Sequence, residues 1–139
     1  MKIMSNLKPE TSMNEPKQPL TISRELRDDL ATVDAKGEVT DVAAKLGIKT
    51  PAGIEFLRNA MANSLLMDRK QQDYGSRNIS RFNAYGCIVR MSDKFERMIN
   101  LYNDRRRRTV NESIMDSWRD FGNYGIIGQM CEMNRWPSE

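Results

Sequence analysis

Two pairs of acidic residues in the C-terminal half have the types and spacing of ligands for a divalent metal ion. Asp93 and Glu96 are three residues apart, and Glu112 and Asp116 are four residues apart. On a helix, both spacings place the carboxylates of a pair on one side. The chain has no histidine and only 2 cysteines, which excludes serine–histidine catalysis and a zinc site of histidines or of four cysteines. Oxygen ligands favour Mg²⁺, or Mn²⁺ in its place.

Further polar side chains accompany these acids. At 100° per residue, the polar residues of the last predicted helix share an arc of about 100°. Because the rest of that helix is apolar, we expect the arc to be at least partly enclosed, where like charges repel unless a cation joins them. Neighbouring bases suit a metal-bound polyphosphate. The arc contains Glu112, Asp116, Arg119, Asp120 and Asn123, and the bases are Arg90, Lys94 and Arg97. The alternative is that both acidic stripes are solvated helix surfaces with ordinary ion pairs.

The elements that position these residues are predicted to be helices. Strand patterns are nearly absent, so we expect an all-α fold, an antiparallel helical bundle with short connections. Residues 1–20 contain three prolines and are predicted to be a disordered arm, which leaves 21–139 as a single helical domain. The predicted helices span residues 23–35, 40–46, 51–72, 84–103 and 112–134, with 73–82 as a structured loop.

Local signals fix several of these boundaries. Thr50 and Asn111 are predicted N-caps, and Gly47 has the position of a helix C-cap. Two apolar stripes predict buried faces. Leu26, Leu30 and Val33 form the first, and Ile88, Met91, Phe95, Ile99 and Tyr102 form the second.

Three segments carry a family resemblance. They are DYG at 73–75, RMSDKFER at 90–97 and NESIMDSWRDFGNY at 111–124. Over residues 60–136 the chain resembles the nucleotide modification associated domain 1 family of phages and bacteria. That family is similar to the MazG-like all-α nucleoside triphosphate pyrophosphatases, which bind magnesium through ExxE on one helix and ExxD on the next. The resemblance implies that Asp93 and Glu96 occupy the first motif, and Glu112 and Asp116 the second. This chain has Asp at the first position and a spacing of four in the second pair.

The resulting hypothesis is a (deoxy)nucleoside triphosphate pyrophosphohydrolase of phage or bacterial nucleotide metabolism, linked to modified nucleotides. Mg²⁺ would activate water for attack on the α-phosphate, with Glu96 or Asp120 as the base and Arg90, Lys94 and Arg97 neutralising pyrophosphate. The predicted nucleotide-binding residues also include Lys70, Asp73, Tyr74, Asn78 and Asn123. The alternative is a nucleotide-binding protein without catalysis.

The sequence also predicts partners and location. Gly122, Gly125 and Gly128 permit close helix approach, and together with Trp118 they predict a homodimer or higher oligomer. No apolar run approaches the ~18 residues of a membrane span, and the N-terminus lacks a signal-peptide pattern. We therefore expect a cytoplasmic protein, in the host cytoplasm if phage-encoded, with Cys87 and Cys131 reduced; a single disulfide is the alternative.

Residues 39–58 resemble a helix-turn-helix, which defines a third hypothesis, a DNA-binding helical module that also uses the basic run Arg105–Arg108. The second helix offers only Lys49 and Arg58 to reach DNA. We therefore predict weak, salt-dependent nucleic-acid binding without sequence preference.

Overall fold

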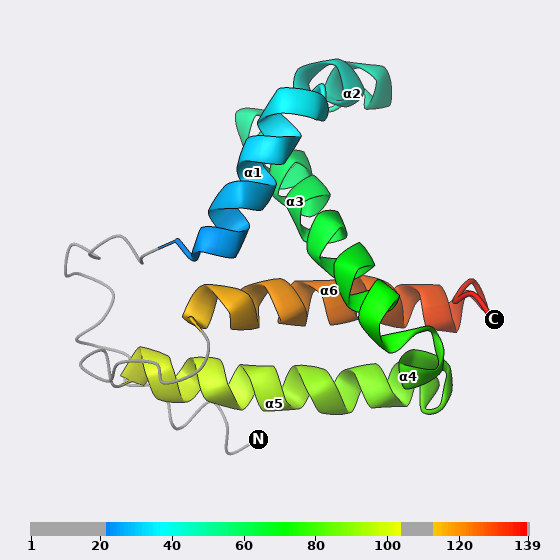
Figure 1. Cartoon of the computed structure of the whole chain (residues 1–139). Helices are drawn as coiled ribbons and strands as arrows, with labels where there is room; N and C mark the ends of the chain where they lie inside the picture. The colour runs from blue at the N-terminus through cyan, green and yellow to red at the C-terminus, as the bar shows by residue number, and fades with distance from the viewer. Residues whose placement is uncertain (1–21, 104–112, 139) are drawn as a thin grey trace. The chain divides into compact units, whose positions relative to one another are not determined.

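The computed structural model describes residues 22–103 and 113–138, and within these ranges it contains six α-helices and no strand (Figure 1). The all-α prediction is confirmed. The predicted arm at residues 1–20 and the basic run 105–108 lie outside the described residues. The helices are α1 (Arg24–Lys36), α2 (Val39–Leu46), α3 (Pro51–Tyr74), α4 (Arg77–Ser80), α5 (Asn83–Asn103) and α6 (Ile114–Glu132).

The described helices divide into two compact units. The first comprises Ile22–Ser76 with α1, α2 and α3, and the second begins at Arg77 and contains α4, α5 and α6. Each unit has packing of its own: α1 and α2 against α3 in the first, and α4 and α6 against α5 in the second. The single domain expected for 21–139 stays a prediction.

The helix boundaries of the first unit follow from local chemistry. The Ser23 hydroxyl accepts the Leu26 N–H at 3.3 Å, and the Thr50 hydroxyl accepts the Gly53 N–H at 3.0 Å, so each caps a helix start. Gly47 ends α2 at φ 78°, a left-handed conformation that glycine adopts without steric cost. Leu26 and Val33 of the predicted face of α1 are buried. The predictions for Thr50 and Gly47 are confirmed.

The predicted loop at 73–82 is partly wrong. Asp73 and Tyr74 complete the last turn of α3, which ends at Gly75 with φ 70°, and Arg77–Ser80 form the short helix α4. The glycine had signalled a turn correctly, but it stops a helix that continues up to it.

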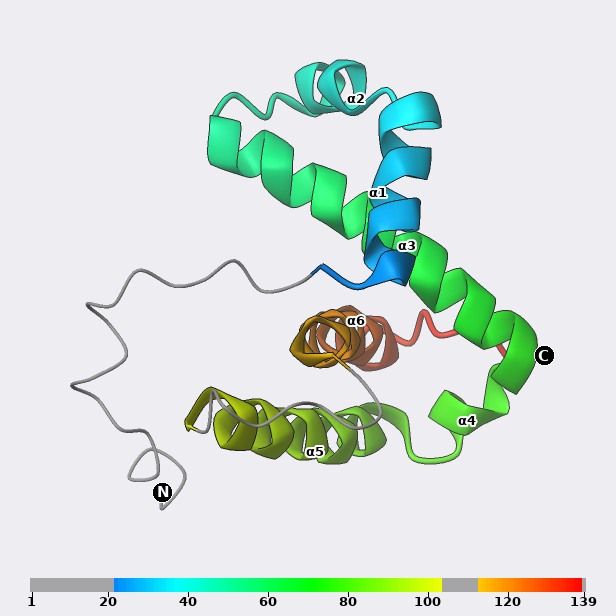
Figure 2. The same ribbon diagram turned by 60° about the vertical axis from the view of Figure 1, so that its left-hand side comes forward.

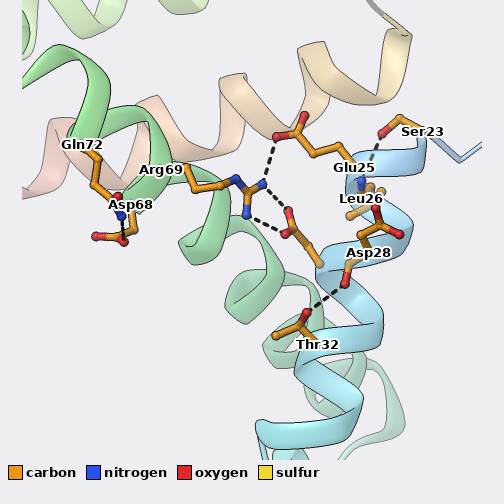
Figure 3. Close-up of polar contacts among 9 residues, drawn as sticks. Ser23, Glu25, Leu26, Asp28, Thr32, Asp68, Arg69 and Gln72 are labelled. Atoms are coloured by element: carbon orange, nitrogen blue, oxygen red, sulfur yellow. Dashed lines mark hydrogen bonds and ion pairs between the residues drawn. The ribbon is translucent and has the colours of Figure 1, made fainter.

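Two arginines of α3 hold α1 in place. The Arg69 guanidinium donates to Asp29 Oδ1 and Oδ2 at 2.8 and 2.9 Å, and to Glu25 Oε1 at 2.9 Å (Figure 3). Arg58 donates to Asp34 Oδ1 and Oδ2 at 2.6 and 2.7 Å. Both are bidentate pairs, the geometry in which arginine binds a carboxylate most specifically.

In the second unit, α5 and α6 form an antiparallel hairpin. They run side by side in opposite directions in Figure 1, and they remain adjacent in Figure 2. A methyl group added at Gly125 would lie 3.9 Å from Met91 Cε, and one at Gly128 would lie 3.8 Å from Cys87 Cβ. A methyl group at Gly122 would meet nothing within 4 Å. Two of the three glycines therefore serve the hairpin itself, and only Gly122 opens outward.

The face of α5 that meets α6 agrees with the predicted one at Phe95, whose ring centroid lies 6.3 Å from that of Phe121 in α6, and at buried Ile99, but not at Ile88. Ile88 is 61% exposed, whereas Cys87 and Met98 are buried and Lys94 reaches α6. The contact face follows the spacing 87, 91, 94 and 98, which places Ile88 about 100° to one side. The prediction of a buried face on α5 is therefore wrong at Ile88.

On α6 the polar arc faces inward, as the sequence predicts. Arg119, Asp120 and Asn123 are buried, whereas Trp118 and Ile126 are 52% and 51% exposed. The helix begins at Ile114 with Ser113 as its N-cap, so the prediction of Asn111 as N-cap is wrong. Ser113 is the N-cap because Asp116, three residues on, forms a reciprocal capping box with it. No helix in the described part of the chain is long and apolar enough to cross a membrane.

Candidate functional site

The first turn of α6 positions Asp116. Its Oδ2 accepts the Ser113 N–H at 3.0 Å and the Ser113 hydroxyl at 2.9 Å, while the Ser113 hydroxyl accepts the Asp116 N–H. The other oxygen, Oδ1, has no hydrogen-bond donor among the described residues. A carboxylate has about four lone-pair sites, so half of this group is used by the helix cap and half is available to a ligand.

One turn further along α6, Asp120 meets a base from α5. Lys94 Nζ lies 3.0 Å from Asp120 Oδ2, and the two side chains are 22% and 8% exposed. Leaving either charge enclosed without the other would be costly, so the pair is expected to fix how α5 and α6 face each other.

Arg97 joins the same region from α5. Its Nη1 donates to the Ser113 carbonyl at 3.2 Å and also to the Ser117 hydroxyl. Arg97 therefore lies over the cap that contains Asp116. We call Lys94, Arg97, Asp116 and Asp120 the hairpin charge cluster: two bases from α5 and two acids from α6, with buried Asn123 on the same helix.

The other predicted residues of α5 lie elsewhere. Asp93 and Arg90 are exposed, and Glu96 is half-buried. At 100° per residue, Glu96 lies about 200° around α5 from Lys94, on the side away from the contact with Asp120. Among the described residues, Asp93, Glu96 and Asp116 do not form a group that could hold a metal ion, and the predicted ligand Glu112 lies outside the described residues.

The fit to a divalent ion follows from these positions. In the part of the chain that is described, no group of three or more acidic or cysteine side chains lies close enough to hold a metal ion. Mg²⁺ is commonly held by one or two carboxylates together with substrate phosphates. Asp116 has one open oxygen, Arg97 contacts its cap, and Lys94 lies one turn away at Asp120. This set fits an ion that one protein carboxylate and the substrate phosphates hold together.

The residues predicted to bind base and sugar are divided between the two units. Lys70, Asp73 and Tyr74 lie in the last two turns of α3, with Tyr74 68% exposed. Asn78 lies in α4 of the second unit.

Around α4 the structure shows a site that the sequence reasoning missed. A cavity of about 500 Å³ is lined by Arg77, Asn78, Ser80 and Arg81, of which only Asn78 had been predicted to bind ligand. A signal was present: residues 74–92 contain three arginines and no acidic residue. The spacing of carboxylates, from which the other candidate residues were predicted, carries no information about such a basic site.

Two other expectations can be placed in the structure. In the helix-turn-helix-like segment, α2 and α3 are present, but Arg58 is bound to Asp34 and to Glu55 Oε1, the latter at 3.2 Å. Cys87 and Cys131 are both buried and free, and burial raises the pKa of the Cys87 thiol. A raised pKa lowers thiolate content, so Cys87 is a poor nucleophile.

Comparison with models of protein families, with curated proteins and with solved structures gives no match for this chain. The resemblance to the nucleotide modification associated domain 1 family stays a prediction, and the site has to be argued from its own geometry.

Proposed function

We propose that this protein binds a (deoxy)nucleoside triphosphate as its Mg²⁺ or Mn²⁺ complex at the hairpin charge cluster. One observation carries the proposal: Asp116, a half-buried carboxylate with an open oxygen, belongs to a helix cap that Arg97 contacts, and Lys94 binds Asp120 one turn further along α6. A metal–phosphate complex presents both a cation and anionic oxygens, so it needs acid and base together.

The roles follow from the contacts. Asp116 Oδ1 would ligate the ion, and Glu112, which directly precedes the cap residue Ser113 in the sequence, is the second ligand that the resemblance implies. Arg97 would donate to a phosphate oxygen from its position over Ser113. Lys94 balances Asp120 and adds positive charge at the same place.

Isothermal titration calorimetry with dATP tests this, with and without Mg²⁺. Asp116→Asn keeps an acceptor for the Ser113 cap but removes the charge. We expect it to lower Mg²⁺-dependent affinity roughly tenfold or more, since a bond to a charged group contributes about 1.5–3 kcal/mol. Asp93→Asn is the matched control. A site at Asp116 predicts no change in the Mg²⁺-dependent affinity for dATP, whereas the ligand set implied by the resemblance predicts a loss of that affinity. If Asp116→Asn binds as wild type does, the proposal is wrong.

Hydrolysis to a monophosphate and pyrophosphate is the second candidate function. It is supported by the nearly enclosed carboxylate of Asp120, one turn from Asp116, which would serve as the base; Glu96 was the other candidate. A panel of canonical and modified dNTPs with Mg²⁺ should then release pyrophosphate, and Asp120→Asn should reduce the rate by about 100-fold or more. Binding without turnover in both proteins would leave the non-catalytic function.

We also propose that the chain forms a homodimer or higher oligomer, within the pyrophosphatase-like bundle that the sequence resembles. The support is an apolar strip on α6, where exposed Trp118 and Ile126 flank the open surface at Gly122. Light scattering at tens of micromolar should show more than one copy, and Trp118→Gln should shift the population toward the monomer.

A further inference from the structure

The cavity at α4 is built from side chains that bind anions. Two guanidinium groups, one amide and one hydroxyl line about 500 Å³. Arg77 and Arg81 are four residues apart and both exposed. Arginine offers five donors in a planar fork that matches phosphate oxygens, and it remains charged at all physiological pH.

Neither arginine is neutralised by an acidic residue of the described part of the chain. Within the described residues, Arg77 and Arg81 form no ion pair, whereas Arg58 and Arg69 each contact two carboxylates. No acidic residue occurs between Asp73 and Asp93, so this stretch of the sequence is basic throughout. Two like charges one helical turn apart repel each other, so a bound anion would relieve the repulsion.

Two exposed aromatic residues follow the lining residues in the sequence. Phe82 directly follows Arg81, whose guanidinium lies 5.5 Å from the ring centroid, and the Phe82 side chain is 60% exposed. Tyr85, three residues on, is 72% exposed. A methyl group at Gly86 would lie 2.7 Å from Phe82 Cβ, so glycine at this position leaves the space that Phe82 occupies. Exposed rings next to arginines are what nucleobases stack on in proteins that bind nucleotides without reading sequence.

We propose that this cavity binds a nucleoside phosphate. The phosphate lies between Arg77 and Arg81, with Asn78 and Ser80 as further hydrogen-bonding groups, and the base stacks on Phe82 or Tyr85. The site needs no metal ion, because the guanidinium groups supply the positive charge. It is separate from the hairpin charge cluster: Lys94, the cluster residue nearest to the cavity along α5, is eleven residues from Asn83 at the start of that helix, which is about 16 Å.

The test measures binding in EDTA, where any Mg²⁺-dependent site is silent. The probes are dAMP, deoxyadenosine, inorganic phosphate and a 5′-phosphorylated single-stranded decadeoxynucleotide. We expect dAMP to bind and deoxyadenosine to bind much more weakly. Arg77→Gln with Arg81→Gln should weaken dAMP binding by about 100-fold, from two charge-assisted contacts. Arg27→Gln with Arg135→Gln removes the same charge from exposed positions elsewhere and should leave the affinity within about twofold.

The aromatic part has its own control. Phe82→Leu with Tyr85→Leu should weaken dAMP binding by about fivefold or more, the usual range for one stacked base, and leave inorganic phosphate unaffected. If the arginine variant binds dAMP as tightly as wild type, or wild type binds none of the probes, the proposal is wrong. A loss shared equally by the control pair would also overturn it, because the effect would then be net charge.

The same experiment identifies the source of the ligand. Tighter binding of the decanucleotide than of dAMP assigns the cavity to single-stranded nucleic acid, and equal binding assigns it to free nucleotides; either result supports a nucleoside phosphate site. Asp116→Asn should bind dAMP normally in EDTA, so this inference and the proposed function fail independently.

Discussion

Two cavities, one in each unit, contain arginines in opposite states. The cavity of the first unit, about 350 Å³, is lined by Arg58 together with acidic residues, and Arg58 is bound to Asp34. The cavity of the second unit, about 500 Å³, has Arg77 and Arg81, and none of its lining residues in the described ranges is acidic. The same side chain is therefore a structural brace in one unit and an available donor in the other.

The difference separates stability from function. Hydrogen bonds that Arg69 donates to Asp29 hold the pKa of Arg69 well above its usual range, and those that Arg58 donates to Asp34 do the same for Arg58. Such pairs connect α1 to α3, and the N–H groups that they occupy are not available to a ligand. Arg77 and Arg81 form no ion pair within the described residues, and a bound anion gives their charges a role.

The largest expected effect is on the stability of the first unit, where Arg69 connects α3 to α1. Arg69→Met keeps the apolar stem but removes the three hydrogen bonds to Asp29 and Glu25. The Asp29 side chain is only 7% exposed, so its charge would remain enclosed. We expect a loss of about 2 kcal/mol in the free energy of unfolding, measured by urea titration with circular dichroism.

Arg27→Met is the matched control, because Arg27 is exposed on α1 and forms no ion pair within the described residues. It should change stability by less than about 0.5 kcal/mol. Equal losses for the two variants would show that the clamp at Asp29 contributes nothing specific.

The sequence predicted the parts of this comparison that depend on local signals. Ser, Thr and Gly at helix ends act over three or four residues, so Thr50 and Gly47 could be assigned without a structure. The all-α class and the inward polar arc of α6 follow from hydrophobic periodicity. The start of α6 could not be decided this way, since Asn111 and Ser113 are both good caps and the reciprocal bond with Asp116 decides between them.

Pairing between helices is where prediction from sequence stopped. Arg58 and Asp34 are 24 residues apart and Arg69 and Asp29 are 40 apart, so nothing in the local pattern joins them. Asp93 and Glu96 were grouped with Asp116 on the assumption that acidic stripes of neighbouring helices face each other. If one helix is rotated by half a turn, that assumption fails even where the helix boundaries are predicted correctly.

A medium effect is expected at α6, where Asp116 is half used by the helix and half open. Ser113→Ala removes the hydroxyl that bonds Asp116 and caps the helix. We expect the free energy of unfolding to fall by about 1 kcal/mol. The measurement is the fluorescence of Trp118 and Trp136 during urea unfolding, since both lie in the second unit. Ser92→Ala, at an exposed position within α5, should cost much less. A cost at Ser92 as large as at Ser113 would contradict the capping role.

A smaller and pH-dependent effect is expected at Arg58. Its hydrogen bonds lower the pKa of Asp34 below the ordinary value of 3.8. A carboxylate with a depressed folded pKa contributes stability above its unfolded pKa, and that contribution disappears as the pH falls through the folded pKa. Arg58→Gln should therefore be less stable than wild type at pH 7, and the difference should shrink below about pH 4 as Asp34 takes up a proton. A difference that stays constant down to pH 2 would show that Arg58 acts through its stem and not through its charge.

The smallest effect, and the one of opposite sign, is expected at α4. Arg77→Gln with Arg81→Gln removes two positive charges four residues apart that no acid balances within the described residues. Like charges at this spacing destabilise a helix by about 0.2–0.5 kcal/mol, so the variant should be as stable as wild type or gain about that amount. Tryptophan fluorescence during urea unfolding measures this in the second unit, and the gain should fade as salt screens the repulsion. A loss of 1 kcal/mol or more would mean that these arginines brace their unit as Arg69 braces the other, and the contrast between the two cavities would disappear.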